Sequence, residues 1–291
     1  MDWGDHGSIT GRCHLQRDHC LDGLISPVTA PFFFEDPRAL TEVRPIFMYQ
    51  NLTGHNNAFN GGSLYFFGTQ ARLALSERFS VVLSELGFFS FDPHNPVPPV
   101  KSDSGFAEVK LGAKYTFLRN VDTGSAAAAG LMLEIPAGSD KVFQNTGDLS
   151  ITPYLSYGQT LFRLPGGYGS LNVLGNMGYS FATDNKRSEF FYANFHLDYN
   201  VANLNKIFPL FEVNWIHYTR HGNNVDLGAE GADLINFGST TREGRNYVSL
   251  AFGARYKFTE NVIAGAALQF PVSPERGLQD YRLTLDLIFR Y

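Results

Sequence analysis

The last eleven residues of the chain, 281–291, read YRLTLDLIFRY. Every second side chain, beginning with the first, is apolar or aromatic, and the side chains between them are polar except for Ile288. A period of two over this length indicates a β-strand with one apolar face and one largely polar face. The stretches 248–258 and 107–117 repeat the pattern. We therefore expect an all-β fold.

Twelve segments with this period can be placed from residue 40 onward. They cover 41–51, 62–75, 79–91, 105–118, 125–136, 148–162, 169–182, 189–201, 207–219, 245–259, 262–271 and 280–291. Strands of soluble proteins usually have about five or six residues, whereas a strand that crosses a membrane needs about 9–11. Most of these segments have the length of membrane-spanning strands.

The connections between the segments alternate in length. The short ones are 76–78, 120–124, 163–168, 202–206 and 260–261. The long ones are 52–61, 92–104, 137–147, 183–188, 220–244 and 272–279, of which 183–188 counts as long only by its place in the series. Outer-membrane barrels have short periplasmic turns and long outside loops. The sequence predicts an antiparallel up-and-down transmembrane β-barrel of about twelve strands, with both termini periplasmic.

A soluble β-sandwich also alternates, with its apolar faces turned to a core. Two features favour the membrane instead. Aromatic side chains sit at strand ends on the apolar face, as Tyr115 and Phe117 do, and this matches the interfacial girdle of a bilayer. The chain also ends on Phe289-x-Tyr291, which resembles the C-terminal signal read by the barrel-assembly machinery. We expect an integral bacterial outer-membrane protein in contact with lipid.

Composition excludes other classes. No stretch approaches the roughly 20 apolar residues of a transmembrane helix. Charged residues make up 18% and the net charge is −5, which gives no reason to expect a nucleic-acid partner. No nucleophile, zinc or phosphate-loop motif is present, so we expect neither an enzyme nor a cofactor.

Residues 1–38 show no period, and Pro27, Pro31 and Pro37 argue against a helix. We expect an irregular periplasmic extension before a barrel of residues 39–291. Its apolar run makes three side chains candidates for a plug inside the barrel: Phe32, Phe33 and Phe34.

The extension also holds both cysteines of the chain, Cys13 and Cys20. They are candidates for a disulfide in an oxidising compartment. Two free thiols or a metal site are the alternatives, and the spacing does not match tetrahedral zinc ligation, so no metal is expected. No signal peptide is recognisable at the N-terminus, so the barrel interpretation requires one to have been removed.

Alternation also assigns a set of charged and polar side chains to the barrel interior. The candidates are Arg44, Arg72, Glu85, Glu108, Lys110, Lys114, Glu134, His196, Asp198, Glu212, Arg255, Arg282 and Asp286. They either line a water-filled pore or pair across a narrow interior. Twelve strands lie between the filled eight-stranded and the open sixteen-stranded barrels, so both arrangements stay open.

Four consecutive stretches then carry a resemblance to a known family: 108–118 (EVKLGAKYTFL), 127–138 (AAAGLMLEIPAG), 147–158 (GDLSITPYLSYG) and 169–181 (GSLNVLGNMGYSF). They resemble the outer-membrane proteins named for a putative meta-pathway of phenol degradation, also called transporters. The resemblance implies a barrel and a role in the uptake of hydrophobic or aromatic compounds. It implies no catalytic residues.

Two functions follow as expectations. The first is a porin-like channel for passive passage of small solutes, hydrophobic or aromatic compounds among them. The second is a closed structural barrel that binds a protein partner through its N-terminal extension or through the 220–244 loop.

Overall fold

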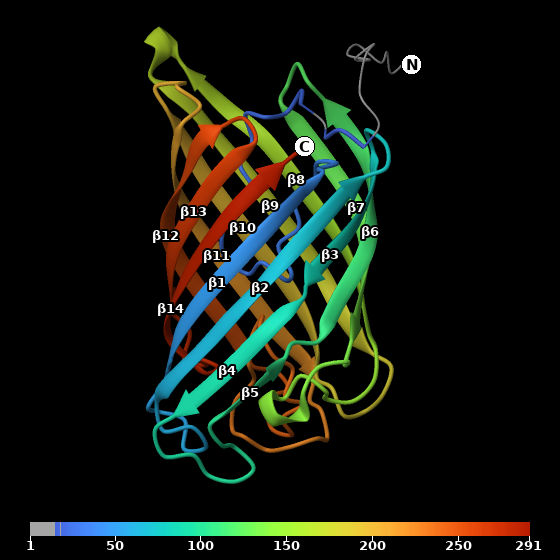
Figure 1. Cartoon of the computed structure of the whole chain (residues 1–291), viewed down its shortest axis with the longest axis vertical. Helices are drawn as coiled ribbons and strands as arrows, with labels where there is room; N and C mark the ends of the chain where they lie inside the picture. The colour runs from blue at the N-terminus through green and yellow to red at the C-terminus, as the bar shows by residue number, and fades with distance from the viewer. Residues whose placement is uncertain (1–14, 18) are drawn as a thin grey trace.

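The computed structural model describes residues 15–17 and 19–291, which form one closed antiparallel β-sheet (Figure 1). The strands are β1 (Glu42–Leu52), β2 (Gly62–Ala74), β3 (Phe79–Glu85), β4 (Gly87–Pro93), β5 (Asp103–Phe106), β6 (Val109–Asn120), β7 (Ser125–Ile135), β8 (Ser150–Leu164), β9 (Gly169–Ala182), β10 (Glu189–Val201), β11 (Ile207–Arg220), β12 (Asn246–Thr259), β13 (Val262–Pro271) and β14 (Gln279–Arg290). Two 3-10 turns are η1 (Asp140–Val142) and η2 (Pro165–Gly167). No helix within the described part of the chain is long and apolar enough to cross a membrane.

The strands occupy twelve positions around the barrel, which we call staves, because two of these positions each hold two shorter strands in succession. β3 and β4 succeed each other along β2, and β5 and β6 succeed each other along β4 and β3. β1 pairs with both β2 and β14, which closes the sheet. The predicted twelve-stranded antiparallel barrel is confirmed, and every predicted strand end lies within two residues of an observed one.

The division of the third and fourth staves was not predicted. β3 ends at Glu85 and β4 begins at Gly87, which lies opposite Gly68 of β2. A Cβ atom on Gly87 would lie 2.6 Å from the carbonyl oxygen of Phe67 and 2.7 Å from the Cα of Gly68. The two strands therefore approach too closely for a side chain here, and the local kink interrupts the ladder.

The first strand begins and the last strand ends at the same rim, which we call the short-turn end because it carries the short connections (Figure 1). Tyr291 donates its N–H to the carbonyl of Thr41, and Arg17 donates its N–H to the carbonyl of Tyr291. The chain therefore enters and leaves the barrel at the same rim. The opposite rim, the long-loop end, carries the long connections.

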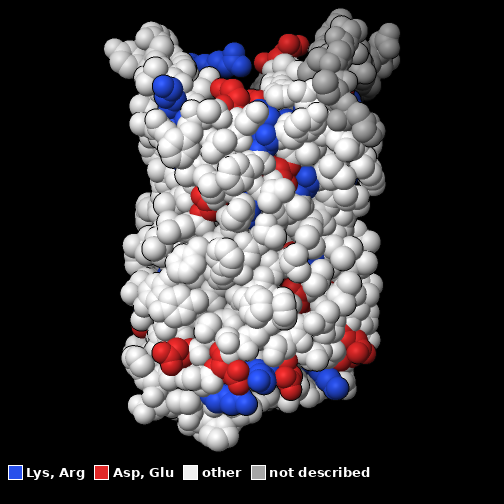
Figure 2. Space-filling view, in the orientation of Figure 1, with Lys and Arg blue, Asp and Glu red and all other residues white. Residues whose placement is uncertain are grey.

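The outer wall of the barrel is apolar. Figure 2 shows a wide, mostly uncharged wall, with a band of acidic and basic side chains near its lower end and scattered charged atoms in its upper half. Its exposed side chains include Phe67, Phe106, Phe252, Tyr256 and Phe289. A band of this kind suits contact with lipid acyl chains, and aromatic residues near its edges suit the interfaces.

The barrel interior is filled. Residues 21–40, which we call the inner segment, enter from the short-turn end, and nearly all of them are buried. The connection between β11 and β12, residues 221–245, enters from the long-loop end; we call it the large loop. Phe33 of the inner segment and Leu234 of the large loop line the same small cavity, so the two segments meet inside the barrel.

Candidate functional site: the barrel interior

All thirteen charged or polar side chains that alternation assigns to the interior are buried there, each less than 10% exposed. The contacts of these side chains were not predicted, because most of the thirteen contact the inner segment or a long loop. Sequence reasoning missed four of these partners, Glu35, Asp36, Arg187 and Asp233. It also missed the buried charged side chains of Arg38 and Glu230. The run Glu35-Asp36-Pro37-Arg38 directly after three phenylalanines was the one available signal, since charges beside a buried apolar run need partners.

The three candidate plug residues lie inside the barrel. The ring of Phe32 lies 5.1 Å from that of Phe66, and the ring of Phe33 lies 5.0 Å from that of Tyr192. Phe34 meets the ring of His196 edge to face. The inner segment thus packs Phe32 against β2, and it packs Phe33 and Phe34 against two positions along β10.

The backbone of the inner segment is held by donors from the wall. Its prolines and irregular course prevent it from joining a β-ladder, so its buried carbonyls need other partners. The bonds run from Lys257 to Asp22, from Asn172 to Gly23, from Arg255 to Ser26 and Pro27, from Arg44 to Val28, from Gln70 to Pro31, from Asn176 to Phe33, from Lys114 to Asp36 and from Thr116 to Pro37.

Glu212 of β11 holds the middle of the inner segment. Its two carboxylate oxygens accept the N–H groups of Val28 and Thr29, each at 2.7 Å, and the hydroxyl of Thr29. His196 Nδ1 lies 2.7 Å from the same carboxylate, and its Nε2 lies 3.1 Å from Asp198. One buried side chain therefore satisfies three donors of the inner segment.

Glu35 is held by two wall cations. Arg72 of β2 binds it with two guanidinium nitrogens, at 2.6 and 3.0 Å, and Lys114 Nζ of β6 lies 3.2 Å away. Burial acts to raise the pKa of Glu35, but Arg72 and Lys114 outweigh it and hold that pKa below its ordinary value. Glu35 therefore stays charged inside the barrel.

A second cluster lies beside it. Asp286 of β14 accepts from Arg255 at 2.7 Å and from Arg44 at 2.7 Å. Gly265 leaves room for this cluster, because a Cβ atom there would lie 2.5 Å from Asp286 Oδ1. Wall charges thus pair with each other as well as with the inner segment.

Toward the long-loop end, wall charges bind the loops. Arg187 contacts Glu108 at 2.8 Å and also pairs with Glu134. Lys110 lies 2.5 Å from Glu134, 3.9 Å from Glu85 and 3.6 Å from the centre of the Phe33 ring.

The large loop is fixed at two further points. The two carboxylate oxygens of Asp233 accept hydrogen bonds from Arg282 Nη1 of β14, at 2.8 and 2.9 Å. Glu230 accepts the Ser188 hydroxyl at 2.6 Å, the Ser239 N–H at 2.7 Å and the Phe237 N–H at 2.9 Å. Burial raises the pKa of Glu230 to about 7, although these hydrogen bonds and the charge of Arg187 oppose the rise.

The predicted Cys13–Cys20 disulfide cannot be placed, because Cys13 lies outside the described residues. Cys20 is half-buried near the short-turn end. The disulfide stays a prediction.

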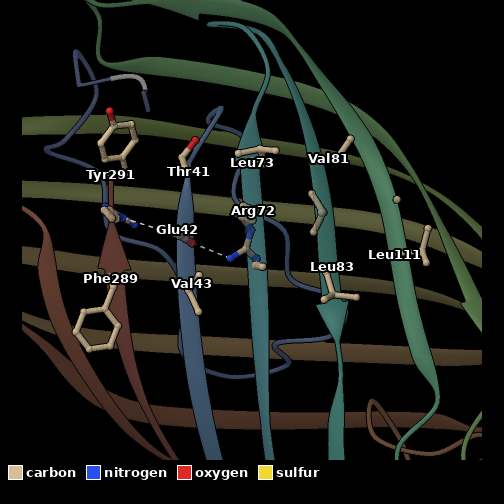
Figure 3. A pocket seen from close by; sticks show the side chains of 14 residues that line it. Thr41, Glu42, Val43, Arg72, Leu73, Val81, Leu83, Leu111, Phe289 and Tyr291 are labelled. Atoms are coloured by element: carbon tan, nitrogen blue, oxygen red, sulfur yellow. Dashed lines mark hydrogen bonds and ion pairs between the residues drawn. The ribbon is translucent and has the colours of Figure 1, made fainter. Parts of the chain in front are cut away.

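The outer wall also carries a hollow of about 640 Å³ at the short-turn end (Figure 3). Val43, Leu73, Val81 and Leu111 line it from four strands, with Phe289 at its side. These side chains face the lipid, whereas Glu42 and Arg72 turn toward each other on the inner side of the same strands.

The comparisons with known proteins agree with this architecture. The family model described as "Putative MetA-pathway of phenol degradation" matches residues 46–287. The fold is similar to that of the COG4313 outer membrane channel from Pseudomonas putida F1, with 13% identity and a TM-score of 0.59 over 92% of this chain and 100% of that chain. It is also similar to the NanC porin, with 9% identity and a TM-score of 0.53 over 86% of this chain and 100% of that chain. No curated protein sequence matches the chain. The structural similarities establish the barrel fold, and the barrel with its apolar wall belongs in the outer membrane.

Proposed function

Because the chain belongs to the outer-membrane family described as "Putative MetA-pathway of phenol degradation", which confirms the expected resemblance, we propose that it is a porin-like channel for small solutes. The inner segment and the large loop close the passage, and solutes cross when both have moved. The inner segment acts as a plug, in line with its expected role.

The observation that carries this proposal is the polarity of the filled interior. A barrel that served only as a membrane anchor could fill its centre with apolar side chains or with ion pairs across the wall. Here Arg255, Arg44 and Lys114 point at backbone carbonyls of a segment that lacks regular structure. Withdrawal of that segment leaves a polar, hydrated lumen, which is what passage of solutes requires.

The remaining expectations belong to the same proposal. Both termini face the periplasm, because the short turns lie at their end of the barrel. Recognition by the assembly machinery through Phe289 and Tyr291 is part of the proposal, and the exposure of both rings supports it. Solutes of the hydrophobic or aromatic class remain the expectation from the family, and we propose no catalytic activity.

The filled interior also favours a second candidate function. A barrel that never opens could bind a protein partner through its N-terminal extension or through the large loop. The same experiment distinguishes the two candidates.

Conductance in planar bilayers tests the channel. We expect the wild-type protein to show rare, brief openings. The double variant Glu212→Gln/Asp233→Asn weakens the contacts of both closing segments without removing volume, and it should conduct steadily. Asp198→Asn is a matched control, because Asp198 contacts His196 on the side away from Glu212. A double variant that assembles as a barrel and still seals the bilayer would favour the closed structural barrel.

A further inference from the structure

The wall charges that hold the inner segment are almost all of one sign. Among the described residues, seven charged side chains of the strands contact the inner segment through hydrogen bonds or ion pairs. One is acidic, Glu212. The six basic ones are Arg44, Arg72, Lys114, Arg255, Lys257 and Arg290. Two wall acids, Glu42 and Asp286, stay beside four of these cations. A lumen vacated by the inner segment therefore has a surplus of cationic groups at its short-turn end.

Two of these cations have a carboxylate of the inner segment as their partner. Arg72 donates one hydrogen bond from Nη2 and one from Nε to Glu35, so each carboxylate oxygen accepts from one nitrogen of the guanidinium group. Lys114 approaches one of the same oxygens at 3.2 Å. All three side chains are at most 2% exposed. A bidentate arginine with an added ammonium group is the arrangement by which proteins recognise carboxylates.

The neighbouring acid cannot replace Glu35. Glu42 of β1 lies 2.7 Å from Arg72, toward which it points in Figure 3, but it also accepts from Arg290 Nε at 2.7 Å. Among the described residues, Glu35 is the carboxylate that pairs with Lys114. Among the described residues, loss of Glu35 thus leaves Lys114 with no carboxylate in contact and leaves Arg72 with a carboxylate that it shares with Arg290. Such a state is strongly unfavourable unless another anion enters.

We infer that Arg72 and Lys114 form the carboxylate-binding site of the open channel, and that Glu35 occupies this site in the closed state. The inference rests on the proposed channel function and narrows its solutes to those that carry a carboxylate group, which hydrophobic and aromatic acids also do. Glu35 is then an internal ligand that competes with the solute.

Competition between the solute and Glu35 for Arg72 and Lys114 favours opening of the channel. A solute that binds Arg72 and Lys114 only when Glu35 has left stabilises the open state by its own binding free energy. The solute thereby promotes the opening of its own passage, and neutral molecules of the same size do not.

Chemical rescue tests the site in the full-length protein. The variant Glu35→Ala vacates the place of the carboxylate, and acetate has the shape of the group removed. We expect sodium acetate to raise the unfolding midpoint of the detergent-folded variant by about 2–4 °C relative to acetamide at equal concentration and ionic strength. Wild type, in which Glu35 fills the site, should show no such difference. The double variant Glu35→Ala/Lys114→Met should lose the acetate effect.

The inferred site is wrong if Glu35→Ala has the same unfolding midpoint in acetate as in acetamide. It is also wrong if the acetate effect persists in Glu35→Ala/Lys114→Met. If Glu35→Ala fails to assemble, Glu35→Ser also vacates the place of the carboxylate, keeps a polar group there, and is compared with wild type for its acetate dependence in the same way. In that variant too, an unchanged midpoint counts against the site.

Bilayer recordings separate this inference from the channel proposal. Replacing chloride by acetate should raise the open fraction of the wild-type channel severalfold, and Lys114→Met should abolish the increase. A barrel that stays sealed in every variant overturns the channel itself, and with it the open-state role of Arg72 and Lys114. A channel that opens equally in both salts, with or without Lys114, overturns the carboxylate inference alone.

Discussion

Glu212→Gln is expected to release the inner segment about 30–100-fold more often than in the wild-type protein. The carboxylate accepts the N–H groups of Val28 and Thr29 with one oxygen each, and the Thr29 hydroxyl with the second. A glutamine amide offers one oxygen and one NH2 group, so a donor faces a donor and a buried N–H loses its partner. The cost of such a loss is roughly 2–3 kcal/mol, and no cavity is created.

Trypsin cleavage after Arg38 measures this release. Arg38 is fully buried in the folded protein, so the bond after it becomes accessible only when the inner segment leaves the barrel. When opening is fast relative to cleavage, the cleavage rate follows the population of the open form. The matched control is Asp198→Asn, which alters the other side of His196. Cleavage of Glu212→Gln at the wild-type rate, in a barrel of unchanged stability, would show that Glu212 does not hold the segment.

The barrel could be predicted from the sequence because its determinants are local. Alternation in stretches such as 281–291 reports which side chains face lipid and which face inward, and this depends only on neighbours two residues apart. The same rule placed Arg72, Lys114 and Glu212 in the interior. The inward register holds along the whole wall, since a slip of one residue would turn every charge toward lipid.

The partners of these side chains could not be predicted, because they are far away in the sequence. Glu35 contacts Arg72 and Lys114 through a segment without any period, and its path depends on the volume that the closed barrel leaves free. Near-equal numbers of interior charges are compatible with pairing across the wall as well as with pairing to an inserted segment. The ion pair between Asp233 of the large loop and Arg282 could not be predicted for the same reason.

Raising the pH from about 5 to 8 is expected to open the large loop roughly 100-fold more often. Burial raises the pKa of Glu230 from 4.5 to about 7 in the closed loop, against opposing hydrogen bonds from Ser188, Ser239 and Phe237 and the charge of Arg187. In an opened, hydrated loop the pKa returns toward its ordinary value. Between pH 4.5 and 7 the closed loop therefore holds a proton that the open loop has lost. The closed state loses stability throughout this interval and loses no more above it, about 3 kcal/mol in all.

Amide hydrogen exchange at Phe237 and Ser239 measures this opening, because both N–H groups donate to Glu230. Their exchange rates, divided by the intrinsic chemical rate at each pH, should rise between pH 5 and 7 and level off near pH 8. Amides in the β11–β12 ladder should show no such rise, since they do not depend on the loop. Glu230→Gln keeps an acceptor in place and cannot ionise, so it should make the corrected rates independent of pH. A pH dependence that survives this substitution would assign the loop's titration to another group, and the closure at the long-loop end would then be insensitive to the charge of Glu230.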